Sequence, residues 1–77
     1  MVTVWHGQGL KIQMYADDHF PPQFHILGPG FEILVRLRDL YILQGKRHPR
    51  EFAPALDWAR DNSPLLLEEW TRLNERD

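Results

Sequence analysis

The clearest prediction of the fold comes from residues 23–37, QFHILGPGFEILVRL. They combine two strand-like runs with a turn between them. The central Gly28-Pro29-Gly30 contains residue types that strongly favour tight turns. After the turn, apolar residues occupy every second position, as expected for a strand with one buried face. These residues are Phe31, Ile33, Val35 and Leu37. The segment therefore predicts strands at residues 23–27 and 31–37.

The flanking residues predict further strands on both sides of this segment. Residues 10–15 alternate apolar and polar side chains, and Gly7 and Gly9 before them suit a turn. Residues 2–5 are consistent with a short edge strand, and residues 40–43 with a short last strand that ends at Gln44-Gly45. We expect a small antiparallel sheet of three to four strands within residues 2–44.

The apolar pattern changes to a helical period after residue 50. A set of four residues has the i, i+3, i+4, i+7 spacing of one helix face, namely Phe52, Ala55, Leu56 and Ala59. Pro54 has to lie in the first turn of this helix or kink it, because proline lacks the backbone N–H donor. Asn62 suits the end of this first helix.

Ser63-Pro64 predicts the start of a second helix, with Ser63 as the N-cap and Pro64 at the first helical position. Its inner face would consist of Leu66, Trp70 and Leu73, and Leu65 and Leu67 widen that face. Strands first and helices last indicate an α+β fold. We expect a single domain over residues 1–77, in which two helices at about residues 50–74 pack on one face of the sheet.

Composition excludes several classes of function. The chain has no cysteine, which rules out disulfides, cysteine-based zinc sites and thiol catalysis. The N-terminus has neither the basic region nor the apolar run of a signal peptide, and no apolar stretch is long enough to cross a bilayer. We therefore expect a cytoplasmic protein that has no membrane partner.

Charge is unevenly distributed although the net charge is only −2. Residues 36–50 carry a local charge of +4, and residues 51–77 carry −4. These segments suit either ordinary solvated faces, a self-complementary surface or a basic patch for an anionic partner. Arg36 and Arg47 are the candidates for contacts to phosphate. Nucleic acid is a minor expectation, because only Tyr41 lies near the basic residues for base stacking.

Residues 17–25 contain the most distinctive chemistry of the chain. Asp17, Asp18 and His19 lie in the loop after the first long strand, and His25 lies on the next strand. If the two strands form a hairpin, these groups converge. Turn chemistry alone explains the Asp and Pro content, because Asp accepts turn hydrogen bonds and Pro stiffens the loop, so a rigid connection with recognition residues is the favoured interpretation. General acid–base chemistry by His19, His25 and Asp18 is the alternative.

The same region resembles a family of small, uncharacterised bacterial proteins with a D-H-x-P-P-H-F-H signature. The matching residues are Met14-Tyr15, Asp17-Asp18-His19, Pro21-Pro22, Phe24-His25, Gly45, Pro49-Arg50, Trp58-Ala59, Leu66-Leu67-Glu68 and Trp70. The resemblance implies a domain of unknown function whose members are often encoded beside another small protein, in toxin–antitoxin-like gene pairs.

Gln23 departs from this signature, in which the corresponding residue is commonly His. Positions 23 and 25 share a strand face, so two histidines there would favour a metal site, whereas an amide oxygen is a poor zinc ligand. What remains is a two-His-one-carboxylate set of Asp18, His19 and His25, with Asp17 as the other carboxylate. We therefore expect no metal and no cofactor.

Small size, segregated charge and the extra leucines of the second helix favour a non-enzymatic interaction module. Its partner would be a second small protein encoded nearby or another copy of the chain, bound through the C-terminal helices or an open sheet edge. The alternatives are a small ribonuclease or hydrolase of toxin type, with His19 or His25 as acid or base and Arg36 or Arg47 on the phosphate, and a metal-binding domain.

Overall fold

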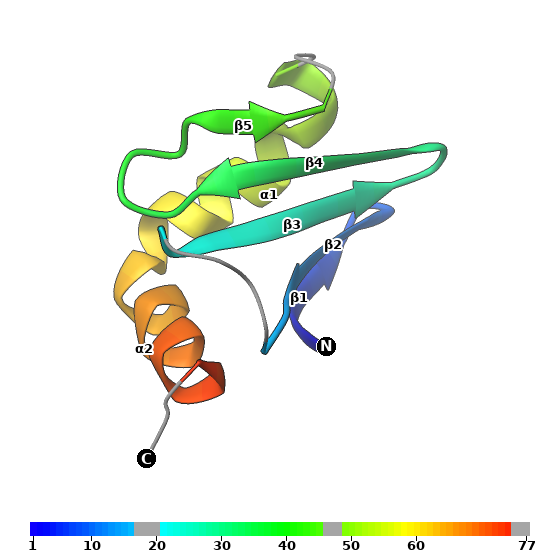
Figure 1. Ribbon diagram of the computed structural model, residues 1–77. Coiled ribbons are helices and arrows are strands. Elements are labelled where there is room, and N and C mark those ends of the chain that lie inside the picture. Colours follow the sequence, from blue (N-terminus) through cyan, green and yellow to red (C-terminus); the bar gives the residue numbers. More distant parts are fainter. Residues whose placement is uncertain (17–20, 46–48, 75–77) are drawn as a thin grey trace.

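The structure is a computed structural model that describes residues 1–16, 21–45 and 49–74. Five strands form one antiparallel sheet in chain order, followed by two helices on one side of the sheet (Figure 1). The strands are β1 (Val2–Gly7), β2 (Leu10–Met14), β3 (Gln23–Gly28), β4 (Phe31–Arg36) and β5 (Ile42–Gln44). The helices are α1 (Pro49–Asp61) and α2 (Ser63–Leu73). The α+β class and the two C-terminal helices are confirmed.

The expected strand count of three to four is wrong, because the sheet has five strands. β1 is the edge strand that was expected, but it is longer than residues 2–5: its six residues pair with β2 from Val2 to Gly7. β5 has only three residues and starts at Ile42, later than predicted. The delay arises in the preceding turn, where Leu40 has a positive φ of 60° and donates its N–H to the Arg36 carbonyl.

The hairpin of β3 and β4 has the register that its turn dictates. Gly28 pairs with Phe31 across Pro29-Gly30, and His25 therefore pairs with Leu34. Gly30 has a φ of 75°, a conformation that glycine adopts without steric cost. The predicted two-strand segment is confirmed, and its alternation assigns each residue to a sheet face.

The helices cover one face of the sheet and enclose the hydrophobic core. Strand residues at every second position and one face of each helix supply the buried side chains, which are Leu10, Ile12, Met14, Phe24, Ile26, Ile33, Val35, Leu37, Phe52, Ala55, Ala59 and Leu66. Leu66 anchors α2, while Trp70 and Leu73 pack at the margin of the core. The opposite face carries no helix among the described residues, and we call it the open face.

A β-bulge in β1 redirects its side chains. Thr3 pairs with Gln13, but the next pair is Trp5 with Ile12, so Val4 is an extra residue in the strand. Simple alternation would place Thr3 and Trp5 on the same face. The bulge instead sends Trp5 to the covered face, where its ring stacks on Trp58 of α1 with centroids 5.9 Å apart.

The boundary between the helices differs from the prediction by one residue. Asn62, and not Ser63, is the N-cap of α2, and its side chain donates to the Trp58 carbonyl at 2.9 Å. Asn62 therefore ends α1, as expected, and also precedes α2 directly. Pro54 lies inside α1 and not in its first turn. Within the described residues, no helix has the length and apolarity to span a membrane.

Candidate functional site

The structure places only part of the expected cluster. Asp17, Asp18 and His19 lie outside the described residues, as does Arg47. His25 and Arg36 are described, on β3 and at the end of β4. β2 and β3 are antiparallel neighbours, which confirms the hairpin on which the proposed convergence depended. The convergence itself stays a prediction.

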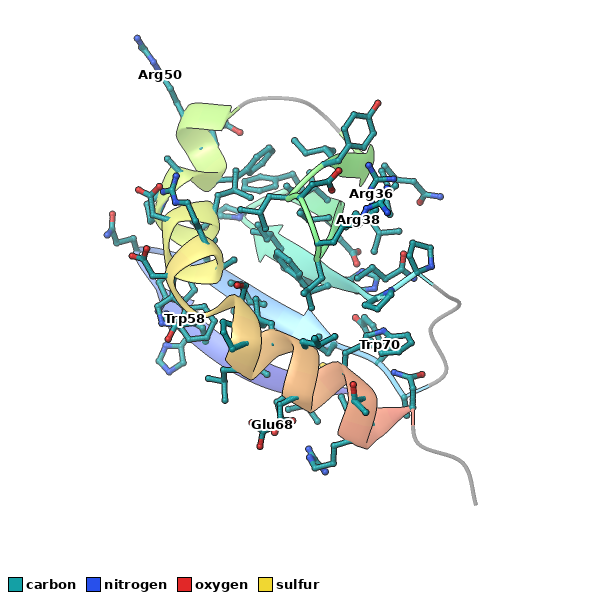
Figure 2. All side chains as sticks on the ribbon, turned by 90° about the vertical axis from the view of Figure 1, so that its left-hand side faces the viewer. Arg36, Arg38, Arg50, Trp58, Glu68 and Trp70 are labelled. Atoms are coloured by element: carbon teal, nitrogen blue, oxygen red, sulfur yellow. The ribbon has the colours of Figure 1, made fainter. Side chains whose placement is uncertain are left out.

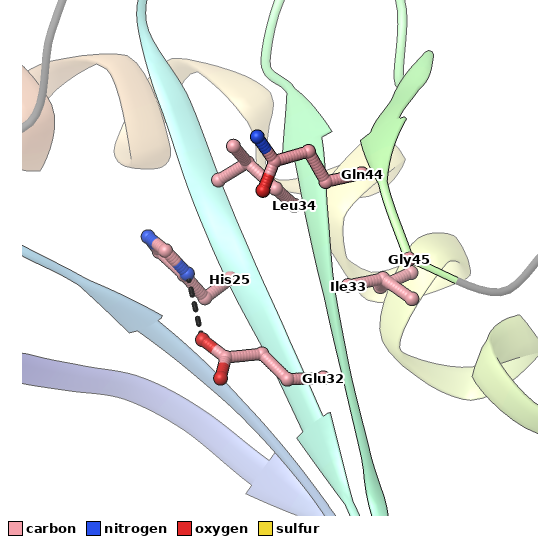
Figure 3. Close-up of a pocket in the computed structure, with 6 residues that line it drawn as sticks. All are labelled: His25, Glu32, Ile33, Leu34, Gln44 and Gly45. Carbon is pink, nitrogen blue, oxygen red and sulfur yellow. Dashed lines mark hydrogen bonds and ion pairs between the residues drawn. The ribbon is translucent and has the colours of Figure 1, made fainter.

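His25 lies on the open face and is held by two neighbouring side chains. Its Nδ1 atom is 2.9 Å from Oε2 of Glu32 on β4, which Figure 3 shows as a dashed line. The Tyr15 ring meets the imidazole edge-on, with centroids 4.5 Å apart. The His25 side chain is only 16% exposed, whereas Glu32 is 51% exposed. The imidazole is therefore oriented by a carboxylate, an arrangement used for general acid–base groups and for recognition.

A hollow of about 340 Å³ lies beside this pair (Figure 3). Its lining comes from three adjacent segments and consists of His25, Glu32, Ile33, Leu34, Gln44 and Gly45. Gly45 closes it with a φ of 105°, where a Cβ atom would lie 2.8 Å from the Glu32 carbonyl oxygen. The hollow is large enough for a small polar group, and His25, Glu32 and Gln44 supply both donors and acceptors.

A row of polar contacts extends from this hollow toward β1. Gln13 donates from Nε2 to the Thr3 hydroxyl at 3.1 Å, and the Tyr15 hydroxyl lies 3.4 Å from Oε1 of Gln13. Gln13 is only 7% exposed, although it faces away from the helices. The open face is therefore an organised polar surface, in which buried amide groups have hydrogen-bond partners.

Glu32 is the residue that the sequence interpretation missed. It alternates with the apolar residues of β4 and reaches His25 diagonally across the hairpin. The Gly28-Pro29-Gly30 turn could have indicated this contact, because the turn sets the register of the two strands. Once Gly28 and Phe31 are paired, Leu27 lies opposite Glu32 and His25 opposite Leu34, which makes His25 and Glu32 diagonal neighbours on one face.

Arg36 already holds a carboxylate. Its Nε and terminal nitrogen donate to Asp39 at 2.8 and 2.6 Å, and the guanidinium lies over the Tyr41 ring at 5.1 Å. These hydrogen bonds lower the pKa of Asp39 to about 2 and raise that of Arg36. The pair neutralises most of the charge that Arg36 would offer a phosphate, so its expected role in binding remains a prediction.

No group of three or more His, Asp or Glu side chains within residues 1–16, 21–45 and 49–74 is arranged to hold a metal ion. In this part of the chain His25 and Glu32 form a pair. The two-His-one-carboxylate set includes Asp18 and His19, which lie outside the described residues, and it stays a prediction.

A second surface lies at the outer side of β1. A groove of about 270 Å³ separates this strand from α2, and it is lined by Val2, Thr3, Val4, Leu65, Glu69 and Arg72. We call it the β1–α2 groove. Arg72 and Glu69 form an ion pair of 2.7 Å at its border. Leu65 is 45% exposed there, and Leu67 is 47% exposed elsewhere on α2, so the expected excess of leucine on this helix is confirmed.

Comparison with known protein families matches residues 9–71 to DUF4160, a domain of unknown function. Comparisons with curated proteins and with solved structures gave no significant match. The matched region includes four of the five strands and nearly all of both helices. It therefore covers the whole core and the hollow beside His25, whereas only Leu65 and Glu69 of the β1–α2 groove lie within it. The chain belongs to the DUF4160 family of domains of unknown function.

Proposed function

We propose that this domain is a non-enzymatic protein-interaction module that binds its partner through β1 and the β1–α2 groove. The observation that carries the proposal is the position of an open strand edge beside an apolar groove. Among the described residues, no strand pairs with the outer side of β1. The edge therefore offers backbone N–H and C=O groups to another chain, while the groove accepts side chains, as in β-strand addition.

The two edges of the sheet are protected to different degrees. β5 has three residues and is interrupted by a bulge, both of which discourage pairing with another chain. β1 has six residues and contains no Lys or Pro, the residue types that commonly block exposed edges. This difference favours β1 as the binding edge, even though it also contains one bulge.

Exposed leucine supplies the apolar part of the binding energy. Leu65 is nearly half exposed beside Val2 and Val4, and full burial of a leucine side chain contributes about 1.5–3 kcal/mol. The more specific form of the proposal is a regulatory role of toxin–antitoxin type, in which the domain acts within a pair of small proteins. It rests on the resemblance described above.

A pair of matched variants tests the binding surface. Leu65→Asp changes the groove, whereas Leu67→Asp changes a leucine of equal exposure that does not line it. Sedimentation velocity would measure self-association and binding to the product of the neighbouring gene. We expect Leu65→Asp to weaken the association at least tenfold, because a charge replaces buried apolar contact, and Leu67→Asp to leave it unchanged. A wild-type chain that binds neither itself nor that protein would refute the proposal.

The orientation of His25 by Glu32 favours a second candidate function, a small hydrolase or ribonuclease of toxin type. In that case His25 would transfer a proton and Glu32 would orient the imidazole. Cleavage of RNA by the purified chain, abolished in both His25→Gln and Glu32→Gln variants, would support it. Growth inhibition and cleavage that are unaffected by both changes would eliminate this function.

A further inference from the structure

The side chains of β1 are distributed over the two sheet faces in a symmetric order. Val2 and Trp5 pair with core residues of β2 and point to the covered face, and Val4 also packs on the core. Gly7 pairs with Leu10, and a Cβ atom added to it would point to the same face, 2.9 Å from the Trp5 ring. Thr3 and His6 pair with Gln13 and Lys11 and point to the open face. From Val2 to Gly7 the order is covered, open, covered, covered, open, covered. The bulge lies at its centre.

This order matters for pairing with an identical strand. In an antiparallel pair, residues directly opposite each other must point to the same face. In a symmetric antiparallel pair of six-residue strands, the first residue of one copy lies opposite the sixth residue of the other. In a strand that alternates without interruption, these two residues point to different faces, so the rule is broken. The bulge at Val4 changes the parity of half the strand. All six residues of β1 can then pair with β1 of another molecule and keep their own faces.

We infer that the partner of the β1 edge is a second copy of this chain, joined by antiparallel β1–β1 pairing about a two-fold axis. The inference rests on the proposed function, since it names the partner of the same surface. In this register Val4 lies opposite Trp5 of the second copy, and Thr3 lies opposite His6 of the second copy. The two sheets become one continuous sheet with the helices of both copies on the same side.

The surfaces beside the strand are compatible with this arrangement. β1 contains no Asp, Glu, Lys or Arg, so the register brings no such like charges together. Val4 lines the β1–α2 groove, so the groove of each copy borders Trp5 of the other. That ring is partly buried against Trp58, and Figure 2 shows Trp58 beside the blue strands β1 and β2. Each copy thus places its Trp5 ring beside the groove of the other, so the same surface is used by both copies, as a two-fold interface requires.

A cysteine pair tests the register, because the chain contains no cysteine of its own. Thr3→Cys/His6→Cys would place two cysteines opposite each other across the axis, within the Cα separation of about 4.4–6.8 Å that a disulfide requires. The single variants would leave their cysteines roughly 10 Å apart, three residues along the strand, and serve as controls. We expect a covalent dimer under mild oxidation from the double variant only.

A pair of charge variants tests the association without a covalent bond. Both contain His6→Glu, and they differ only at position 3, as Thr3→Glu or Thr3→Lys. Thr3 and His6 are exposed, so we expect both variants to fold, although Thr3→Lys also removes the acceptor of the Gln13 Nε2 hydrogen bond; circular dichroism and thermal denaturation would verify the fold. We expect the dimer dissociation constant of the Glu/Glu variant to exceed that of the Lys/Glu variant about tenfold, because two like-charge cross-strand pairs replace two opposite-charge pairs.

The outcomes separate this inference from the proposed function. A chain that is monomeric at about 1 mM overturns the inference. The proposed function would stand in that case if Leu65→Asp still disrupted binding to the neighbouring gene product. A dimer that neither cross-links in the double cysteine variant nor responds to the charge variants would also overturn the inference, because the copies would then associate through another surface.

Discussion

The two faces of the sheet come from the same strands, yet they have opposite characters. In β3, Ile26 has no exposed surface and packs under the helices, while the next residue, Leu27, is half-buried on the open face. Gln13 and Met14 of β2 show the same contrast, since one is hydrogen-bonded on the open face and the other lies in the core. The helices create the difference, because they supply apolar packing partners to one face only.

The residues that stabilise the domain and the residues available for recognition therefore lie on different faces of the sheet. The covered face supplies the apolar burial that holds a chain of 77 residues together. Most side chains of the open face and of the outer side of β1 can be substituted without removing a core residue. Four predictions test this separation.

The largest expected effect comes from neighbouring isomeric side chains on β3. Ile26→Ala should lower the free energy of unfolding by about 2–5 kcal/mol, because it leaves a cavity in the core. Leu27→Ala removes nearly the same atoms from a half-buried position and should cost only about 1 kcal/mol. Urea denaturation of both variants measures the difference. Equal losses would mean that the open face is as well packed as the covered one.

The next effect concerns the backbone that closes the open-face hollow. Gly45→Ala combines a positive φ of 105° with a Cβ atom only 2.8 Å from the Glu32 carbonyl oxygen. We expect a loss of about 1–3 kcal/mol for this strained position. Gly9→Ala is the matched control, since Gly9 has a φ of 79° but no described atom within 4 Å of its added Cβ. Thermal denaturation should rank Gly45→Ala as the more damaging change, and the reverse order would contradict the close approach of β4.

A smaller effect should follow from the polar row on the open face. Gln13→Ala removes the hydrogen-bond partner of Thr3 and Tyr15, and should cost about 1 kcal/mol. Lys11→Ala, an exposed residue of the same strand and face, should stay within about 0.5 kcal/mol of the wild type. Chemical denaturation that gives no difference between the two would show that the row does not stabilise the fold.

The smallest expected effect is the dependence of stability on pH through Asp39. Arg36 lowers the pKa of this carboxyl from 3.8 to about 2 in the folded chain. The contribution of the ion pair is therefore fully present above the unfolded pKa near 4 and is lost as the pH falls through about 2. The stability difference between wild type and Asp39→Asn should shrink over this interval. Because the pair is exposed, the difference should also decrease with salt.

Local sequence patterns predicted the parts of the fold that depend on local interactions. Alternation assigned Phe31, Ile33 and Val35 to one face, and the Gly28-Pro29-Gly30 turn joined the two central strands, because neighbouring residues alone decide both features. The helix faces followed in the same way from their period. The start of α2 was misplaced by one residue because Asn62 and Ser63 are both good capping residues.

The candidate site was less predictable, since its contacts connect different strands. His25 was identified from its residue type, but its partner Glu32 required the register of the β3–β4 hairpin. The groove beside β1 could not be predicted, because it depends on where α2 packs relative to β1. No residue pattern within β1 or α2 indicates that position. The helical pattern predicts that Leu65 lies beside the inner face of the second helix. It does not predict that Leu65 is a neighbour of Val2 and Val4.

Sequence patterns alone predict the class of the fold, the covered faces of β2, β4, α1 and α2, and the turn that joins β3 to β4. These follow from the spacing of apolar residues, which acts within a few positions of the chain. Only the tertiary structure decided that β1 is a full strand with a bulge at Val4, that His25 meets Glu32, and that α2 borders the open edge. Each of these depends on which segments lie side by side, and that arrangement is set by the packing of the whole core.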